Sequence, residues 1–293
     1  MKIAIASGKG GTGKTFVSTN LFYASVYDGN QITLVDCDAE APNTTLFLKG
    51  VCESIEHVYS YFPSIDVDAC AFCGKCVEAC HFNAIFYLSQ KKRIHVLNEL
   101  CHSCGACSYV CKHGAITEHA KSIGTIKRIA YRNTSPIAEC RMEIGVASPV
   151  PIIKQAIRNV DNDAMVLLDS PPGVSCPFIA TVETADYVIL VTEPTPFGLN
   201  DLRLSIQTLQ QMGIAFGVII NRDGIGNQKM ENWLNEENIP ILMKIPYDSL
   251  IAETYAEGKI VSEINSMYLS KFRELMKILE ENSTEQRVAL CKK

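Results

Sequence analysis

The chain lacks any apolar run long enough to cross a membrane, and it lacks an excess of positive charge. A membrane-spanning helix needs about 20 consecutive apolar residues, and no stretch of this sequence approaches that length. The formal net charge of −5 argues against broad binding of nucleic acid. The first residues resemble a buried strand and a glycine-rich loop, not a signal peptide. We therefore expect a cytoplasmic protein with no stable membrane association and no nucleic-acid partner.

Cysteine, by contrast, is abundant, with 13 in 293 residues. Eight of them form two runs of the pattern C-x-x-C-x-x-C-x-x-x-C, and the second run repeats the first at an offset of 31 residues (101 − 70). A disulfide framework has no reason to repeat in this way, whereas thiolate ligands of metal centres are spaced like this, so a reducing compartment is indicated. The runs comprise Cys70, Cys73, Cys76 and Cys80, then Cys101, Cys104, Cys107 and Cys111.

A glycine-rich loop at residues 7–15, SGKGGTGKT, satisfies the pattern G-x-x-x-x-G-K-[S/T]. It follows an apolar strand predicted at Lys2–Ser7 and precedes a helix predicted at Thr15–Tyr27, which is the context that this phosphate-binding motif requires. Backbone N–H groups and the helix dipole would hold the phosphates. Lys14 is expected to reach the β- and γ-phosphates, and Thr15 to bind Mg²⁺. The predicted nucleotide-binding residues of the loop are Gly8, Lys9, Gly10, Gly11, Thr12, Gly13, Lys14 and Thr15.

Strands and helices alternate along most of the chain, which predicts an α/β fold with a mostly parallel sheet covered by helices on both faces. We expect a discontinuous α/β domain at 1–63 and 120–293, interrupted by a small α+β domain at 64–119. Within the insert, residues 85–97 are typical of a β-hairpin with its turn at Ser89–Lys92. The other predicted strands are Ile32–Asp38, Met165–Asp169, Tyr187–Glu193, Phe216–Asn221 and Ile241–Ile245, and helices are expected near 198–212, 228–237, 248–257 and 266–282.

The loop GKGGTGKT, with its early second lysine, resembles the deviant Walker A motif of the MinD/ParA/nitrogenase-iron-protein group of P-loop ATPases. VDCD at 35–38 resembles switch I, LDSPPG at 168–173 resembles Walker B and switch II, and INR at 220–222 resembles the strand end that reads adenine. Together with VTEPTPFGL at 191–199 and the cysteine repeat, nearly the whole chain is similar to MinD/Mrp-type ATPases that carry an inserted bacterial-type ferredoxin domain.

This resemblance implies a homodimer that binds ATP and Mg²⁺, with a role for each matching residue. Lys9 would cross the dimer interface to the partner subunit's γ-phosphate, and Asp38 would position the attacking water. Strand-end capping is the alternative for Asp36 and Asp38. The implied catalytic residues are Lys9, Lys14, Asp38 and Asp169; the implied Mg²⁺ ligands are Thr15, Asp38 and Asp169; and Asn221 and Arg222 are the implied contacts to adenine.

In ferredoxins with two clusters, the fourth cysteine of each run binds the other cluster. The resemblance therefore assigns one 4Fe–4S cluster to Cys70, Cys73, Cys76 and Cys111, and a second to Cys101, Cys104, Cys107 and Cys80. Zinc is the alternative metal for such thiolates. Cys140 and Cys176 lie at spacings similar to those of the nitrogenase iron protein, so a third cluster between subunits stands beside simple packing. The C-terminal C-x-x-C of Mrp-type carriers is absent.

Three functions fit these patterns. The first is an ATPase, slow and stimulated by its partner, that couples dimer switching to electron transfer or metallocluster assembly with a redox or cofactor-assembly protein. The second is a carrier that delivers clusters to apo-proteins. The third is a MinD/ParA-like positioning ATPase. A membrane-binding C-terminal helix would support the third, but residues 268–282 carry three basic and three acidic side chains, so we expect this helix to dock on the core.

Overall fold

A nine-stranded sheet forms the centre of the computed structural model, which describes residues 1–132, 135–160 and 165–290. The strand order is β11-β10-β9-β1-β8-β2-β7-β6-β3. Neighbouring strands from β11 to β7 are parallel, whereas β6 is antiparallel to both β7 and β3. The strands are β1 Lys2–Ala6, β2 Ile32–Asp36, β3 Val51–Ile65, β6 Ile116–Tyr131, β7 Ser135–Met142, β8 Met165–Asp169, β9 Tyr187–Thr192, β10 Phe216–Asp223 and β11 Ile241–Pro246.

Helices cover both faces of this sheet and bury two separate apolar clusters against it. Side chains of α5, α6, α7 and α8 belong to one cluster, and those of α1, α10 and α11 to the other. The predicted fold class, a parallel sheet between two helical layers, is therefore confirmed for this part of the chain. The helices are α1 Lys14–Tyr27, α2 Thr44–Phe47, α5 Val150–Arg158, α6 Cys176–Val182, α7 Pro196–Met212, α8 Lys229–Glu236, α9 Ser249–Ala256, α10 Val261–Ile264 and α11 Ser266–Leu290.

The C-terminal helix α11 docks on the core, as its sequence predicts. Phe272 and Leu279 are fully buried, and the Phe272 ring meets Phe16 of α1 edge to face at 6.0 Å. None of the helices in the described ranges is long and apolar enough to cross a membrane.

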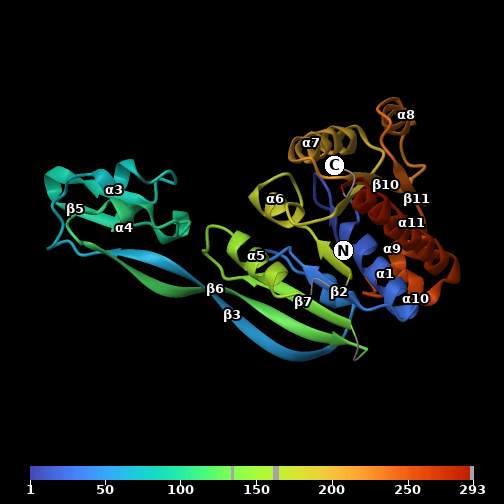
Figure 1. The fold of residues 1–293 in the computed structure, drawn as a ribbon, viewed down its shortest axis with the longest axis horizontal. Helices are drawn as coiled ribbons and strands as arrows, with labels where there is room; N and C mark the ends of the chain where they lie inside the picture. The colour runs from blue at the N-terminus through green and yellow to red at the C-terminus, as the bar shows by residue number, and fades with distance from the viewer. Residues whose placement is uncertain (133–134, 161–164, 291–293) are drawn as a thin grey trace.

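Strands β3 and β6 form a long antiparallel ribbon that leaves the edge of the sheet (Figure 1). Near the sheet, Val58, Ile123 and Ile126 are buried in the same cluster as α5. The ladder continues to the pair Ile65–Ile116. The predicted domain boundaries at 64 and 119 fall inside this continuous ladder, so the division of the chain there stays a prediction.

The segment between the two ribbon strands is a small unit at the far end of the ribbon (Figure 1). It contains the predicted hairpin, which is confirmed by pairing from Ile85–Val96 to Leu88–Arg93. Its apolar core is small, with buried Ile85, Ile94 and Cys107 surrounded by partly buried cysteines. The elements are α3 Lys75–Glu78, β4 Ile85–Leu88, η1 Ser89–Lys91, β5 Arg93–Val96, η2 Asn98–Leu100 and α4 Ala106–Val110.

Candidate nucleotide site and candidate cluster sites

The glycine-rich loop lies between β1 and α1, at the carboxyl edge of the parallel strands. Gly11 and Gly13 have φ of 77° and 98°, in the left-handed region that favours glycine. A Cβ on Gly13 would stand 2.3 Å from the side-chain nitrogen of Asn221. That nitrogen donates a hydrogen bond to the Thr12 carbonyl at 2.8 Å. The end of β10 therefore fixes the loop directly, through a contact that only glycine at position 13 permits.

Thr15 and Asp169, two of the three predicted Mg²⁺ ligands, are in direct contact. The Thr15 hydroxyl donates to Asp169 Oδ2 at 2.9 Å, while the buried Oδ1 of Asp169 has no hydrogen-bond partner among the described residues. Burial, followed by the nearby Asp36 carboxylate, raises the pKa of Asp169 to about 8. Burial also lowers the pKa of Lys14, against the opposing attraction of Asp169 and Asp38. An unpartnered carboxylate oxygen beside a hydroxyl and a lysine fits Mg²⁺ and a phosphate group.

Asp38, the third predicted Mg²⁺ ligand, lies half-buried in the loop after β2 and makes no hydrogen bond to Thr15 or Asp169. Its neighbour Asp36 accepts hydrogen bonds from the backbone and hydroxyl of Thr44 at 3.0 and 2.9 Å. These bonds lower the pKa of Asp36, but burial outweighs them and raises it to about 6. The capping interpretation therefore holds for Asp36, and the catalytic role of Asp38 stays a prediction.

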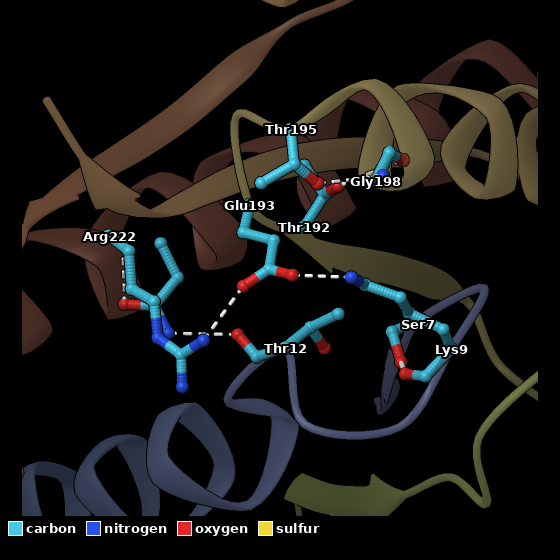
Figure 2. A network of polar contacts seen from close by, with 9 residues as sticks. Ser7, Lys9, Thr12, Thr192, Glu193, Thr195, Gly198 and Arg222 are labelled. Carbon is cyan, nitrogen blue, oxygen red and sulfur yellow. Dashed lines mark hydrogen bonds and ion pairs between the residues drawn. The ribbon is translucent and has the colours of Figure 1, made fainter. Parts of the chain in front are cut away.

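Glu193, directly after β9, holds two of the predicted site residues. Figure 2 shows Lys9 and Arg222 approaching its carboxylate from opposite sides. The Arg222 guanidinium donates to Oε2 at 2.8 Å, and Lys9 Nζ donates to Oε1. Burial would raise the pKa of Glu193, but the two cations hold it below its ordinary value. Lys9 is thus bound to its own subunit.

The sequence reasoning did not place Glu193 in the site. The available signal was its position in VTEPTPFGL, because an acid at the carboxyl end of a parallel strand lies where these sheets bind ligands.

A pocket beside the glycine-rich loop has the right position for a nucleotide base. Asn221 retains one N–H and one lone pair beyond the bonds to Thr12 and to the Arg222 backbone. Asn221 therefore still has a donor and an acceptor for adenine. The contact of Asn221 and Arg222 with adenine stays a prediction. The pocket is lined by Gly11, Gly13, Phe16, Asn221, Arg222, Pro246, Tyr247, Asp248, Ile251, Ala252 and Tyr255.

The eight cysteines of the insert surround two cavities, four cysteines to each. In each set, three cysteines come from one sequence run and the fourth from the other, which is the grouping that the sequence predicts; cluster binding itself stays a prediction. In the part of the chain that the structure describes, no three His, Cys, Asp or Glu side chains converge on a position for one metal ion. One cavity is lined by Cys70, Cys73, Cys76 and Cys111, and the other by Cys80, Cys101, Cys104 and Cys107.

The backbone around both cavities is repeated as well as the sequence. Phe72 and Ser103 occupy equivalent positions and have φ of 50° and 53°. Their N–H groups point to the sulfurs of Cys70 and Cys101, at 3.4 and 3.5 Å. A non-glycine residue in this region is strained by roughly 1–3 kcal/mol, and N–H donors to sulfur are a means of tuning iron–sulfur centres. Residue type gave no signal for either position.

Cys140 and Cys176 do not offer a shared site at the surface. Cys140 is completely buried on β7, and burial raises the pKa of its thiol well above the ordinary value. Cys176 is exposed at the start of α6. A cluster between two subunits needs both thiols at the surface, so the packing interpretation is favoured for Cys140.

The parallel sheet, the glycine-rich loop and the Thr15–Asp169 pair together define a P-loop nucleotide-binding protein. The chain belongs to the CobQ/CobB/MinD/ParA nucleotide binding domain family, whose match spans residues 3–261. This confirms the predicted MinD/ParA family, while the subgroup with an inserted ferredoxin domain stays a prediction.

Most of the chain is also similar to individual proteins. The Methanocaldococcus jannaschii protein MJ0579 is 30% identical over 91% of this chain and 93% of its own. The cytosolic Fe-S cluster assembly factor NUBP1 homolog of Brugia malayi is 25% identical over 95% of this chain and 80% of its own. The structure of the septum site-determining protein MinD of Pyrococcus horikoshii with Mg-ADP matches with a TM-score of 0.60 and 22% identity, covering 96% of each chain, which shows the fold.

Proposed function

We propose that this protein is a homodimeric ATPase that carries two 4Fe–4S clusters in an inserted ferredoxin-like domain. ATP binding and hydrolysis would switch the dimer and couple it to electron transfer or metallocluster assembly with a protein partner. The observation that supports this most is the division of eight cysteines between two cavities, at the end of a ribbon that continues the sheet of a P-loop fold.

The pattern of the cysteines favours iron–sulfur clusters over zinc. A 4Fe–4S cluster takes one cysteine at each iron, and in ferredoxins with two clusters the fourth cysteine of each run binds the other cluster. The two cavities, with one N–H donor to sulfur in equivalent positions of each, fit this arrangement. When bound, the clusters would store and pass single electrons.

A continuous series of contacts leads from the nucleotide site to the ribbon. The Ala39 carbonyl, next to Asp38, accepts a hydrogen bond from the Met142 N–H of β7 at 2.8 Å. Met142 in turn pairs with Gly124 of β6, one of the two ribbon strands. A shift of the loop that carries Asp38 would therefore displace β7 and, through it, the ribbon. This supports the proposal that the nucleotide controls the position of the insert.

The second candidate is a carrier that hands its clusters to apo-proteins. The names of the NUBP1 and NUBP2 relatives, cytosolic Fe-S cluster assembly factors, favour it and a cytosolic location. Such a carrier would lose its clusters to an apo-ferredoxin within minutes to hours, whereas an electron-transfer protein would keep them through redox cycles. The positioning ATPase has less support, because α11 is docked on the core.

The coupling is tested by the rate at which a chelator, bathophenanthroline disulfonate, removes iron from the anaerobically purified protein. We expect different rates with ATP and with ADP, and we expect Lys9→Ala to remove the difference. Asp38→Ala, which should hold the ATP state, is the positive control and the bait for isolating the partner. Equal rates in both nucleotides, with both shown to be bound, would contradict the coupling.

A further inference from the structure

The two cysteine cavities differ in the cations near them, although their sequences repeat. Five cations lie on the segments that border the cavity of Cys70 and Cys111, together with the acidic Asp66 and Asp68. All five are exposed, and none forms an ion pair within the described ranges of the chain. They are Lys75, Lys91, Lys92, Arg93 and Lys112, and we call them the basic rim.

Contacts within the insert bring the members of the basic rim to the same cavity. Lys75 itself lines it, and Lys112 follows Cys111, which also lines it. The other three cations form the turn of the β4–β5 hairpin and the first residue of β5. This hairpin is held against the cavity because Ile94 lines it and the Tyr87 hydroxyl donates to the Phe72 carbonyl.

The second cavity has no lysine or arginine among the residues that line it or that directly adjoin them in the sequence. The Glu118 carboxylate lies 3.5 Å from the position of a Cβ on Gly105, which lines this cavity, and accepts a hydrogen bond from Ser108 at 2.8 Å. Glu99 stands two residues before Cys101, but Asp68 stands two residues before Cys70, so this position does not distinguish the two cavities. At the position equivalent to Lys75 this half of the repeat has Ala106. The charge asymmetry therefore distinguishes the two ends of the insert.

We propose that the basic rim is the docking surface for a small acidic flavoprotein that carries one electron at a time, so that electrons enter and leave the insert at the cluster of Cys70, Cys73, Cys76 and Cys111. This inference rests on the proposed function in its electron-transfer form. Unpaired cations attract an acidic partner over roughly 10 Å at physiological salt and increase its rate of association. Cys73 lines the same cavity and is exposed, so a docked carrier would lie against the cluster edge.

The step that this surface would serve is the transfer of one electron. A reduced 4Fe–4S cluster is oxidised by one electron, and the flavin of the docked carrier takes up that electron and one proton from solvent to become the neutral semiquinone. No bond to the protein forms or breaks. Encounters of this kind use small and transient interfaces, which a rim of a few cations around one cavity suits.

The test is stopped-flow oxidation of the dithionite-reduced holoprotein by an acidic flavodoxin in its oxidised form. Lys91→Gln/Lys92→Gln changes the rim at the hairpin turn, away from the cysteines. We expect the second-order rate at low salt to fall about tenfold, with a weaker dependence on ionic strength. Lys49→Gln/Lys229→Gln is the control, because both lysines are exposed, form no ion pair among the described residues and lie outside the insert. It carries the same net charge and should change the rate less than about twofold.

The iron content of the wild-type protein and of both variants shows whether a negative result contradicts the proposed function or only the docking surface. If the wild-type protein holds no clusters, the proposed function fails. If all three proteins hold the same iron and react with flavodoxin at equal rates, the docking surface is wrong while the clusters stand. The docking surface is equally wrong if the control slows as much as the rim variant, because net charge and not the rim would then set the rate. Hexaammineruthenium(III), a cationic oxidant, should react no more slowly with the rim variant than with wild type.

Discussion

At the scale of single residues, Lys9 has one observed partner and a different predicted one. In this structure it is paired with Glu193 of its own chain, whereas the resemblance to MinD/ParA ATPases gives it a phosphate on the other subunit. The Glu193 carboxylate is also held by Arg222, and its pKa lies below the ordinary value. Because folding lowers the pKa of Glu193, the ion pairs stabilise the folded protein fully at any pH above the pKa that Glu193 has in the unfolded chain. That stability is lost only as the pH falls through the lower folded-state value, so Glu193 restrains Lys9 at neutral pH.

We predict that Glu193→Gln promotes the ATP-dependent dimer. A partly exposed ion pair of this kind contributes about 0.5–1 kcal/mol, so the ATP concentration for half-dimerisation should fall roughly two- to fivefold. Lys9→Ala should abolish the dimer. Light scattering of both variants with ATP and ADP measures this, and an intact ATP dimer in Lys9→Ala would disprove the role of Lys9.

Asn221 combines two roles that can be separated. Its bond to the Thr12 carbonyl fixes the glycine-rich loop, while its place in the pocket suits contact with a base. Asn221→Ala should weaken ATP binding about five- to tenfold, since it removes one buried hydrogen bond and leaves its partner unsatisfied. Calorimetry with tripolyphosphate separates the roles. Equal weakening for tripolyphosphate and ATP indicates loop fixation alone, and unchanged tripolyphosphate binding would contradict loop fixation.

At the scale of elements, the sequence did not predict the β3–β6 ribbon, the neighbouring strand β7 or the helices α5 and α6. The other parallel strands were predictable because they are short apolar runs, as Ile32–Asp36 shows. The ribbon strands mix polar and apolar residues, and the β3–β6 ladder shifts register at two places. Such strands obey no simple alternation, so periodicity does not reveal them. The position of the ribbon is fixed instead by the packing of its residues nearest the parallel strands, such as Val58 and Ile126, against α5.

The residues of the candidate sites also divide into those that the sequence predicted and those that it did not. The glycine-rich loop was visible because its spacing defines it, and the cysteine grouping followed from the spacing together with the resemblance to ferredoxins with two clusters. Glu193 and the left-handed Phe72 and Ser103 were not, because their roles depend on neighbours that only the fold brings close.

Gly124 tests whether the ribbon is fixed to the body of the protein. A Cβ there would lie 2.3 Å from the Arg141 carbonyl and 2.5 Å from the Ile152 side chain. Gly124→Ala should therefore lower the free energy of unfolding by about 1–3 kcal/mol, seen as a fall in Tm. The control is Gly10→Ala, where a Cβ meets nothing within 4 Å. An unchanged Tm for Gly124→Ala would show that the ribbon can move away from β7 and α5 at no cost.

At the scale of the whole molecule, two cysteine cavities lie at the far end of the β3–β6 ribbon, which extends from the sheet of the P-loop fold (Figure 1). Neither the P-loop fold nor the cysteine repeat alone accounts for the function that we propose. The cysteine repeat by itself indicates a passive electron carrier, and the P-loop by itself indicates a nucleotide switch. The ribbon beside β7, with its contacts to the loop after β2, gives a physical reason why the two would act together.

The metal content of the protein purified without oxygen tests this account most directly. Two 4Fe–4S clusters predict about eight iron atoms per chain, and Cys111→Ser and Cys80→Ser should each lower this to about four, because each removes a ligand of a different cluster. Cys140→Ser should leave it unchanged. Zinc with little iron, or iron that survives the loss of Cys80 and Cys111 together, would contradict the account.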